Sequence, residues 1–241
     1  MYIKNIKTKM KKLNPNWITG FTDAEGCFYI NFYKNKNKNK WHIQPSFQID
    51  LHAKDKNLLR EIQSIFEDKG TIFTSKIYYK VSYRVYGILD IVKVIIPHFD
   101  KYPLITKKQS DFLLFKSIIE IISKGQHLTD SGLFKIASLK ASLNKGLPEK
   151  LNKYFPTIIK VERPKVNIPI NINPHWIGGF YSGEGCFYVN IYKSKEHKIG
   201  YGIALQIILG QHNRDRLLLE KIVNILESGK IYERKNSNTI V

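Results

Sequence analysis

The sequence predicts an α+β protein built from two copies of one unit. Residues 14–34 (NPNWITGFTDAEGCFYINFYK) recur as residues 173–193 (NPHWIGGFYSGEGCFYVNIYK), at an offset of 159 with 14 of 21 positions identical. In each copy, apolar residues at helical spacing lead directly into a stretch of alternating apolar and polar residues, as in a strand with one buried face. We expect a first unit at 14–144, a proline-containing linker at 145–172 and a second unit at 173–241, each unit running helix, strand, strand, helix, strand.

The composition indicates a polyanionic partner and argues against a secreted or membrane protein. Lys and Arg number 39 against 20 Asp and Glu, a formal net charge of +19, and such an excess favours nucleic acid. Cys27 and Cys186, 159 positions apart, make a poor disulfide framework, which favours a reducing compartment. The sequence has no run of 18 apolar residues and no apolar N-terminal core, so we expect neither a membrane partner nor a secretory signal.

The first helix of each unit carries a start signal and a stripe of small residues. Asn14 as N-cap and Pro15 in the first turn favour a helix start, and the helix should end near residues 25–26. Residues four apart lie on one side of a helix, so small residues at that spacing let a second helix approach closely. The predicted helix interface consists of Gly20 and Ala24 in the first unit and of Gly179 and Gly183 in the second.

Alternation and helical stripes place the remaining elements of the first unit. Residues 27–33, 41–51 and 77–86 alternate as strands with one apolar face. Apolar stripes predict covering helices at about 55–68, 88–96 and 108–123, and Thr129 should cap a further helix that reaches about residue 144.

The second unit is expected to be incomplete. At the repeat offset, Val241 corresponds to Ser82, so the counterparts of the last strand and of the covering helices are missing. We therefore expect a truncated or degenerate second unit, with part of the apolar face of its sheet exposed.

Two nine-residue stretches, Ile18–Gly26 (ITGFTDAEG) and Ile177–Gly185 (IGGFYSGEG), resemble LAGLIDADG motifs. The runs at 47–55, 102–116 and 161–169 also resemble the monomeric, two-motif homing endonucleases of fungal mitochondrial introns, so the resemblance covers nearly the whole chain. It implies two pseudo-twofold-related αββαββα units with saddle-shaped antiparallel sheets, the motif helices packed at their interface, in a mitochondrial monomer. It also implies site-specific hydrolysis of both strands of double-stranded DNA at a long asymmetric target, leaving short 3′ overhangs.

Glu25 and Glu184, the last acidic residues of the motifs, are the candidate catalytic metal ligands. Each ends a helix, where the helix dipole disfavours a carboxylate, and a close second carboxylate disfavours ionisation further. A divalent cation reverses both effects, and hard oxygen ligands suit Mg²⁺ or Mn²⁺. By resemblance, two main-chain carbonyls would also bind metal, those of Ala24 and Gly183. Ser182 replaces Asp23 in the second motif, and because that position is not a ligand in the family, little catalytic loss is expected.

Two further catalytic assignments are suggested by resemblance. Gln48 and Gln206 are matched at an offset of 158, at a position that organises solvent around the metals in the family. A DNA-base contact or a plain surface glutamine fits them equally well. Lys107 and Lys108 lie where the family often has a transition-state lysine, and the sequence does not choose between them or exclude a solvated basic turn.

The polar strand faces are the predicted DNA-binding surface. Gln and Asn can pair with adenine edges in the major groove, and Arg or Lys with guanine. The Lys- and Asn-rich stretch 34–40 is better suited to phosphates. The candidates for DNA contact are Asn31, Tyr33, Lys34, Asn35, Lys36, Gln44, Ser46, Gln48, Lys80, Ser82, Arg84, Asn190, Tyr192, Lys193 and Gln206.

Two other functions stay open on the same scaffold. One is an intron RNA maturase, which would have intron RNA as its partner. The other is a DNA-binding protein that no longer cuts. Retention of a glutamate in both motifs favours the nuclease.

Overall fold

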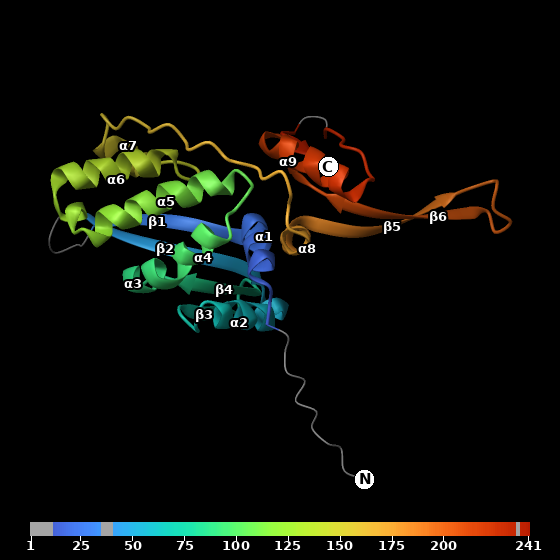
Figure 1. The fold of residues 1–241 in the computed structure, drawn as a ribbon, viewed down its shortest axis with the longest axis horizontal. Coiled ribbons are helices and arrows are strands. Elements are labelled where there is room, and N and C mark those ends of the chain that lie inside the picture. The colour runs from blue at the N-terminus through green and yellow to red at the C-terminus, as the bar shows by residue number, and fades with distance from the viewer. Residues whose placement is uncertain (1–11, 35–40, 235–236) are drawn as a thin grey trace, which may run out of the picture.

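The structure, a computed structural model, describes residues 12–34, 41–234 and 237–241 (Figure 1). The first unit and the linker run α1 (Pro15–Glu25), β1 (Gly26–Lys34), β2 (Trp41–His52), η1 (Ala53–Asp55), α2 (Lys56–Ile65), β3 (Thr71–Ser75), β4 (Lys80–Val85), α3 (Ile88–Asp90), the π-helical η2 (Ile91–Ile95), α4 (Ile96–Lys101), α5 (Lys108–Ser123), η3 (Gln126–Leu128), α6 (Asp130–Ser142) and α7 (Glu149–Tyr154). The second unit runs α8 (Pro174–Glu184), β5 (Gly185–Lys193), β6 (Tyr201–Leu209), β7 (Gln211–His212), η4 (Asn213–Asp215), α9 (Arg216–Leu226) and β8 (Thr239–Ile240). This order confirms the α+β class. Within the described ranges, no helix is long and apolar enough to cross a membrane.

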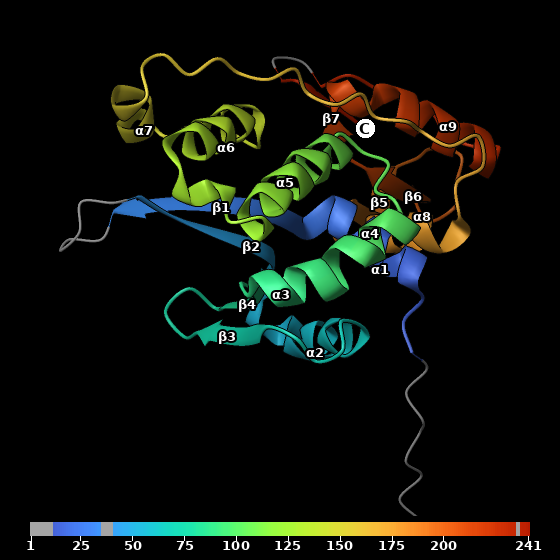
Figure 2. The ribbon, with the colours of Figure 1, turned by 60° about the vertical axis from the view of Figure 1, so that its left-hand side comes forward.

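The first unit is a four-stranded antiparallel sheet, in the order β1-β2-β4-β3, with helices packed on one face. The predicted alternation of β1 and β2 is confirmed, because Phe28, Ile30, Phe47 and Ile49 are all buried. They belong to one core with the apolar stripe of α5, which lies across β1 and β2 in both views (Figures 1 and 2). The opposite face of this sheet carries the polar residues of both strands and remains available for a partner.

Two predicted segments have different structures from those expected. The strand expected at 77–86 begins at Lys80, because residues 76–79 form the turn of the β3–β4 hairpin, where Tyr79 has a left-handed φ of 47°. Ile77 and Tyr78 are accordingly exposed at this turn instead of alternating. The predicted linker contains helix α7, whose Leu151 packs beside α6 because it is the apolar residue of that short helix.

Helices α1 and α8 pack side by side through their glycines, as the small-residue stripe predicts. A Cβ added at Gly20 would lie 2.0 Å from the Trp176 carbonyl oxygen, and one added at Gly179 would lie 2.0 Å from the Trp17 carbonyl oxygen. These two contacts are the same contact with the units exchanged, which is the relation expected of a pseudo-twofold axis. A Cβ added at Gly183 would lie 2.5 Å from the Cβ of Ala24, so the close approach continues to the C-terminal ends of both helices.

Neighbouring glycines of α8 offer a direct test of this packing. Gly179→Ala should lower the free energy of unfolding by about 2 kcal/mol, because main-chain atoms of α1 must move to admit the methyl group. At Gly178 the nearest atom to an added Cβ is Trp17 Cδ1 at 3.8 Å, an ordinary contact. Gly178→Ala should therefore raise the free energy of unfolding by about 0.5–1 kcal/mol through helix propensity. Urea denaturation of both variants checks the prediction, and equal effects of the two substitutions would contradict it.

A partly buried histidine near α1 makes the stability of the first unit depend on pH. His98 lies among aromatic rings and 3.2 Å from the Thr19 hydroxyl, and burial lowers its pKa to about 4. Because the folded-state pKa lies below the unfolded value of about 6.5, this contribution to stability is present above pH 6.5 and is lost as the pH falls toward 4. Lowering the pH from 7 to 4 should cost the wild type about 2 kcal/mol more than His98→Gln. Denaturation of both proteins at each pH measures this, and a constant difference between them would count against it.

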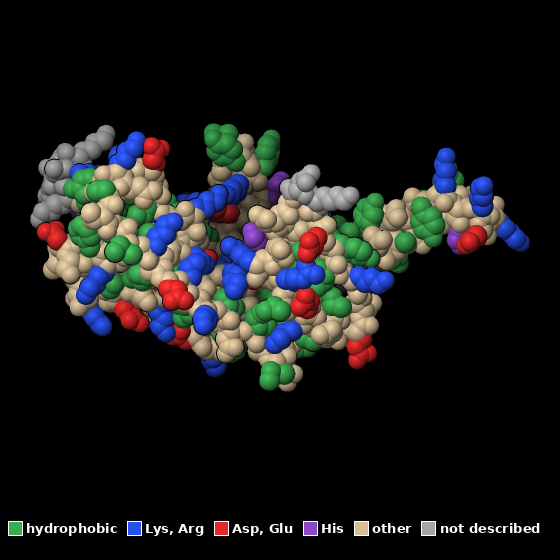
Figure 3. Space-filling model, turned by 90° about the horizontal axis from the view of Figure 1, so that it is seen from above, with side chains coloured by type: hydrophobic (Ala, Val, Ile, Leu, Met, Phe, Trp, Pro, Cys, Tyr) green, Lys and Arg blue, Asp and Glu red, His purple; other side chains and the backbone are tan. Residues whose placement is uncertain are grey.

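The second unit pairs β5 with β6 as a long hairpin arm (Figure 1), and β7 pairs with β8. One face of the arm carries apolar side chains, as in β1 and β2, but these are largely exposed, which confirms the expected exposure. They include Phe187, Val189, Ile191, Ile203, Leu205 and Ile207. Figure 3 shows hydrophobic side chains along the arm and basic side chains at its tip.

The strand register corrects the match between Gln48 and Gln206. Cys27 pairs with Gln48 in the first unit, whereas the equivalent Cys186 pairs with Ile208. Gln206 pairs with Tyr188, the position that Ser46 occupies opposite Tyr29. The offset in these second strands is thus 160, not 158, and the prediction that Gln206 is the counterpart of Gln48 is wrong.

Candidate functional site

Two carboxylates meet where α1 and α8 end. Asn14 and Asn173 cap the two helices by accepting the main-chain N–H groups of Asn16 and His175, so both helices begin and end at equivalent residues. Glu25 and Glu184 are the last residues of the helices, and Glu25 Oε1 lies 3.5 Å from the position that a Cβ on Gly183 would take. The predicted convergence of the two glutamates at one end of the helix pair is thus present.

The surroundings of both glutamates favour their neutral forms. Burial raises the pKa of Glu25 above its usual range, the negative charge of Glu184 raises it further, and Lys108 opposes both effects. Burial also raises the pKa of Glu184, against a hydrogen bond from Gln211 and the charge of Lys108. A cation placed between these carboxylates would remove the repulsion and favour both charged forms.

Lys108, and not Lys107, lies at this carboxylate pair. Its Nζ donates to the carbonyl oxygens of Thr22 at 2.9 Å and Ala24 at 3.1 Å, in the last turn of α1. Burial lowers the pKa of Lys108, while nearby acidic groups, both glutamates among them, raise it. The main-chain N–H of Lys107 donates instead to Asp215, whose pKa is raised by burial against the effect of this hydrogen bond.

Two cavities flank the helix ends, and each contains one glutamate. A cavity of about 750 Å³, here called the Glu184 half-site, is lined among others by Ala24, Gln48, Lys108, Glu184 and Gln211. A second cavity of about 580 Å³, the Glu25 half-site, is lined among others by Glu25, Asp50, Lys80, Ser182 and Gly183. Each half-site therefore combines the glutamate of one motif helix with the penultimate residue of the other: Glu184 with Ala24, and Glu25 with Gly183. The carbonyls of Ala24 and Gly183 are the metal ligands that the family resemblance implies.

The two half-sites differ in their basic groups. Lys108 reaches the Glu184 half-site from the start of α5. In the Glu25 half-site, Lys80 Nζ forms an ion pair with Asp50 at 2.9 Å. The lysine of the Glu25 half-site is thus paired with an aspartate, whereas Lys108 in the Glu184 half-site donates to main-chain carbonyls.

The donor set suits a hard divalent cation. Within the described residues, no group of three or more His, Cys, Asp or Glu side chains is arranged to hold a metal ion. A cation here would therefore rely on the two glutamates, main-chain oxygens and oxygens of a bound substrate, which is the oxygen-rich, incomplete shell that Mg²⁺ accepts. The carboxylates and carbonyls present fit such an ion.

The predicted DNA-contact residues divide by exposure. Gln44, Tyr33, Tyr192, Lys193 and Gln206 are exposed on the strands, and Asn31, Gln48, Arg84 and Asn190 are half-buried. Ser46 and Ser82 are only 3% and 7% exposed, with Tyr29 opposite Ser46 and Phe73 opposite Ser82 on the adjacent strands, so they present little surface to a partner. Asn35 and Lys36 lie outside the described residues.

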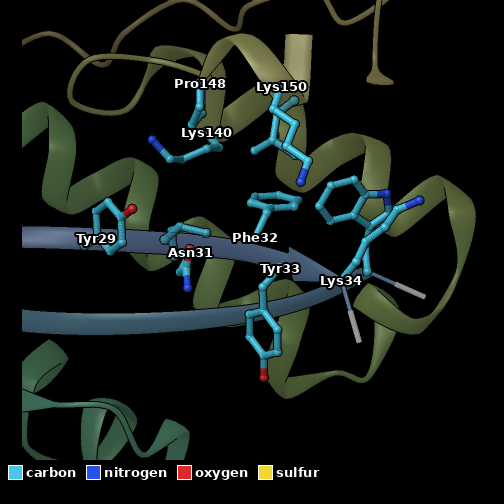
Figure 4. A pocket seen from close by; sticks show the side chains of 11 residues that line it. Tyr29, Asn31, Phe32, Tyr33, Lys34, Lys140, Pro148 and Lys150 are labelled. Carbon is cyan, nitrogen blue, oxygen red and sulfur yellow. The ribbon is translucent and has the colours of Figure 1, made fainter. Parts of the chain in front are cut away.

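The outer end of β1 combines aromatic and basic side chains (Figure 4). Tyr33 points away from Phe32, which faces the helices, so alternation continues to the end of the strand. Lys34 Nζ lies 4.4 Å from the Tyr154 ring centroid and 5.2 Å from that of Trp41. In Figure 3, basic side chains gather around a hollow near the middle of the molecule. These arrangements agree with the net charge of +19 in favouring a polyanion.

The comparisons with known proteins identify the family. The family described as LAGLIDADG endonuclease matches residues 18–119 and 177–241. The chain belongs to the LAGLIDADG endonuclease family.

Curated relatives of this chain include fungal proteins of different lengths. Probable intron-encoded endonuclease 2 of Neurospora crassa is 39% identical over 235 residues, covering 93% of this chain and 50% of the relative. Probable intron-encoded DNA endonuclease 1 of Mycosarcoma maydis is 28% identical over 251 residues, covering 97% of this chain and 88% of the relative. The chain thus spans half the length of the first relative, and only 42% of a second Neurospora protein, probable intron-encoded endonuclease 3.

Solved LAGLIDADG structures share the fold. The I-SmaMI LAGLIDADG homing endonuclease bound to cleaved DNA superimposes with a TM-score of 0.90 at 39% identity, covering 95% of this chain and 76% of that one. I-LtrWI bound to target DNA gives 0.89 at 38% identity, covering 94% and 76%. These matches confirm the two-domain saddle fold that the motifs implied.

Sequence reasoning missed two residues of the site. Gln211 hydrogen-bonds Glu184. The signal for its position was the next residue, His212, which caps η4 as His52 caps η1, at an offset of 160. Asp23 is buried beside Lys108 and accepts hydrogen bonds from residues 105–106 and from Trp176. Burial raises its pKa to about 6. Since Asp23 is not a ligand candidate, its role in organising residues 105–106 could not be expected from the motif alone.

Proposed function

We propose that the chain is a homing endonuclease, which cuts both strands of double-stranded DNA at a long asymmetric target by metal-dependent phosphodiester hydrolysis. The observation that carries the proposal is the convergence of Glu25 and Glu184 at the ends of two closely packed helices. Family membership, a net charge of +19 and the polar strand faces support it. The division into units at 14–144 and 173–241, joined by 145–172, belongs to the same proposal.

Glu25, Glu184 and the carbonyls of Ala24 and Gly183 would hold Mg²⁺, or Mn²⁺, against the scissile phosphates. Bound metal would supply charge neutralisation, an activated water and stabilisation of the leaving oxygen. A solved I-SmaMI complex with uncleaved DNA in the presence of calcium ions agrees with divalent-cation binding in that relative.

The side chains around Glu184 would orient the reacting groups. Lys108, which donates to the Ala24 carbonyl, can turn its ammonium toward a phosphate oxygen entering the half-site and stabilise the negative charge that develops there. Gln48 and Gln211 line the same cavity and can each hold a water by hydrogen bonds.

DNA recognition would use the sheet faces opposite the helices. The exposed Gln44, Tyr33, Tyr192, Lys193 and Gln206 and the half-buried Asn31 and Arg84 are suited to the major groove and adjacent phosphates. Intron-encoded relatives in fungi support a mitochondrial location, and the joining of two units in one chain supports action as a monomer.

A selection from a randomised duplex library tests the proposal. The protein should recover cut duplexes that share one long site with short 3′ overhangs in Mg²⁺ or Mn²⁺, and no cut duplexes with EDTA. Specific binding without a cut in any divalent cation would instead indicate a non-cleaving DNA-binding protein. Faster splicing of an intron RNA without DNA cleavage would indicate a maturase.

A further inference from the structure

The segment that presents Lys108, residues 105–108, is here called the lysine turn. Its main-chain N–H groups are all held by side-chain oxygens. Those of Ile105 and Thr106 donate to Asp23, at 3.0 and 3.4 Å, and that of Lys108 donates to the Thr106 hydroxyl at 3.1 Å. The Thr106 hydroxyl in turn donates to Asp23 at 2.5 Å. The lysine turn is thus fixed by side chains and not by regular helix bonds.

The remaining N–H of the lysine turn is held by the other unit. Lys107 is the N-cap of α5 and makes no capping bond with its own side chain. Its N–H donates to Asp215 Oδ1 at 2.8 Å, and Asp215 is only 5% exposed. Asp215 ends η4 of the second unit, and Figure 2 shows β7, just before η4, beside the start of α5.

A second contact from the same unit reaches the lysine turn indirectly. Trp176 Nε1 on α8 donates to Asp23 Oδ2 at 2.9 Å, the oxygen that also accepts from Ile105. The second unit therefore touches the lysine turn from two directions, through Asp215 and through Trp176 with Asp23. In the first unit, the counterpart of Asp215 at the offset of 160 is Asp55, and neither residue caps the helix that follows it with its side chain.

We propose that Asp215 of the second unit is a positioning residue for Lys108 of the first unit. By fixing the Lys107 N–H, Asp215 sets where α5 begins and hence where the next side chain, Lys108, enters the Glu184 half-site. The lysine would be correctly placed only when the two units are docked. This inference rests on the proposed function for its catalytic consequence, but not for the placement of the lysine itself.

Chemical labelling measures the placement without any cleavage. Full-length wild type, Asp215→Leu and Asp215→Asn are treated briefly with an amine-acetylating reagent, and acetylation of Lys108 is quantified by mass spectrometry against that of exposed lysines. Asp215→Leu removes the charge-assisted hydrogen bond to the Lys107 N–H and so frees the lysine turn. The labelling rate of Lys108 should rise about tenfold, which corresponds to the loss of one such bond. Asp215→Asn should restore slow labelling because its amide oxygen can accept the same N–H, and Asp55→Leu should label as the wild type does.

Strand-resolved cleavage of a selected target measures the consequence. Asp215→Leu should slow cutting of the strand served by the Glu184 half-site about tenfold and leave the other strand and DNA affinity unchanged. Equal loss on both strands, or unchanged Lys108 labelling, overturns the inference and leaves Asp215 as a structural cap. A wild type that cuts neither strand would defeat the proposed function, while the labelling comparison would still decide the role of Asp215.

Discussion

Replacing Glu184 by Gln should slow cleavage of one DNA strand by about 10³-fold, since an amide cannot supply the negative charge that holds a divalent cation there. Gln keeps the size of the side chain and its hydrogen-bonding oxygen, so folding and DNA affinity should change little. Glu25→Gln should cause a similar loss on the opposite strand, because the two glutamates open into different half-sites.

Strand-specific end labels on a duplex carrying the selected target separate the two rates, and supercoiled plasmid reports nicked and linear products together. Each variant should convert plasmid into the nicked form. Continued double-strand cleavage by both variants at the wild-type rate would remove the glutamates from the mechanism. DNA affinity measured in Ca²⁺ serves as the folding control.

Lys108→Met should produce the second large effect, a loss of about 10²-fold in cleavage of the strand served by the Glu184 half-site. Met keeps most of the length and the apolar contacts of the side chain but removes the charge beside both glutamates. Because the Lys108 charge lowers the pKa of both glutamates, the variant should also need a higher pH for half-maximal cation binding.

The neighbouring Lys107→Met is the matched control, since Lys107 contributes its main-chain N–H to the lysine turn and that group is unchanged in the variant. Rates at saturating DNA for each strand distinguish the two lysines. A loss in Lys107→Met as large as that in Lys108→Met would mean that the basic character of the turn matters and not the placement of one ammonium group.

The repeat made the helix pair and its glutamates predictable, because motif helices of equal length with small residues on one side can end only at the same place when they pack. It did not make the strand partners predictable. Gln206 resembled Gln48 in its local sequence, yet the second strand is shifted by two positions and interrupted at Gly210, so Gln211 reaches Glu184 instead. Similarity between two short strands shows only that their residues are alike, whereas the hydrogen-bond register of a strand depends on the whole hairpin.

The lysine turn shows a different limit. Two adjacent lysines are equivalent in sequence, and their roles separate only because residues distant along the chain, Asp23 and Asp215, fix the main-chain N–H groups of residues 105–107. Similarly, the polar face of the sheet was correctly predicted, but the burial of Ser46 and Ser82 depends on the size of their neighbours across the strands.

The main-chain contacts at Gly20 and Gly179 bear on how such a nuclease could diversify. Because backbone atoms, and not side chains, set the gap between α1 and α8, the spacing between the two reaction centres is a property of the scaffold. Under the proposed function, substitutions on the strands would change the DNA sequence that the protein recognises without altering the stagger between the two breaks. The ends left for the host's repair machinery would then keep the same form however far the recognition sequence drifts.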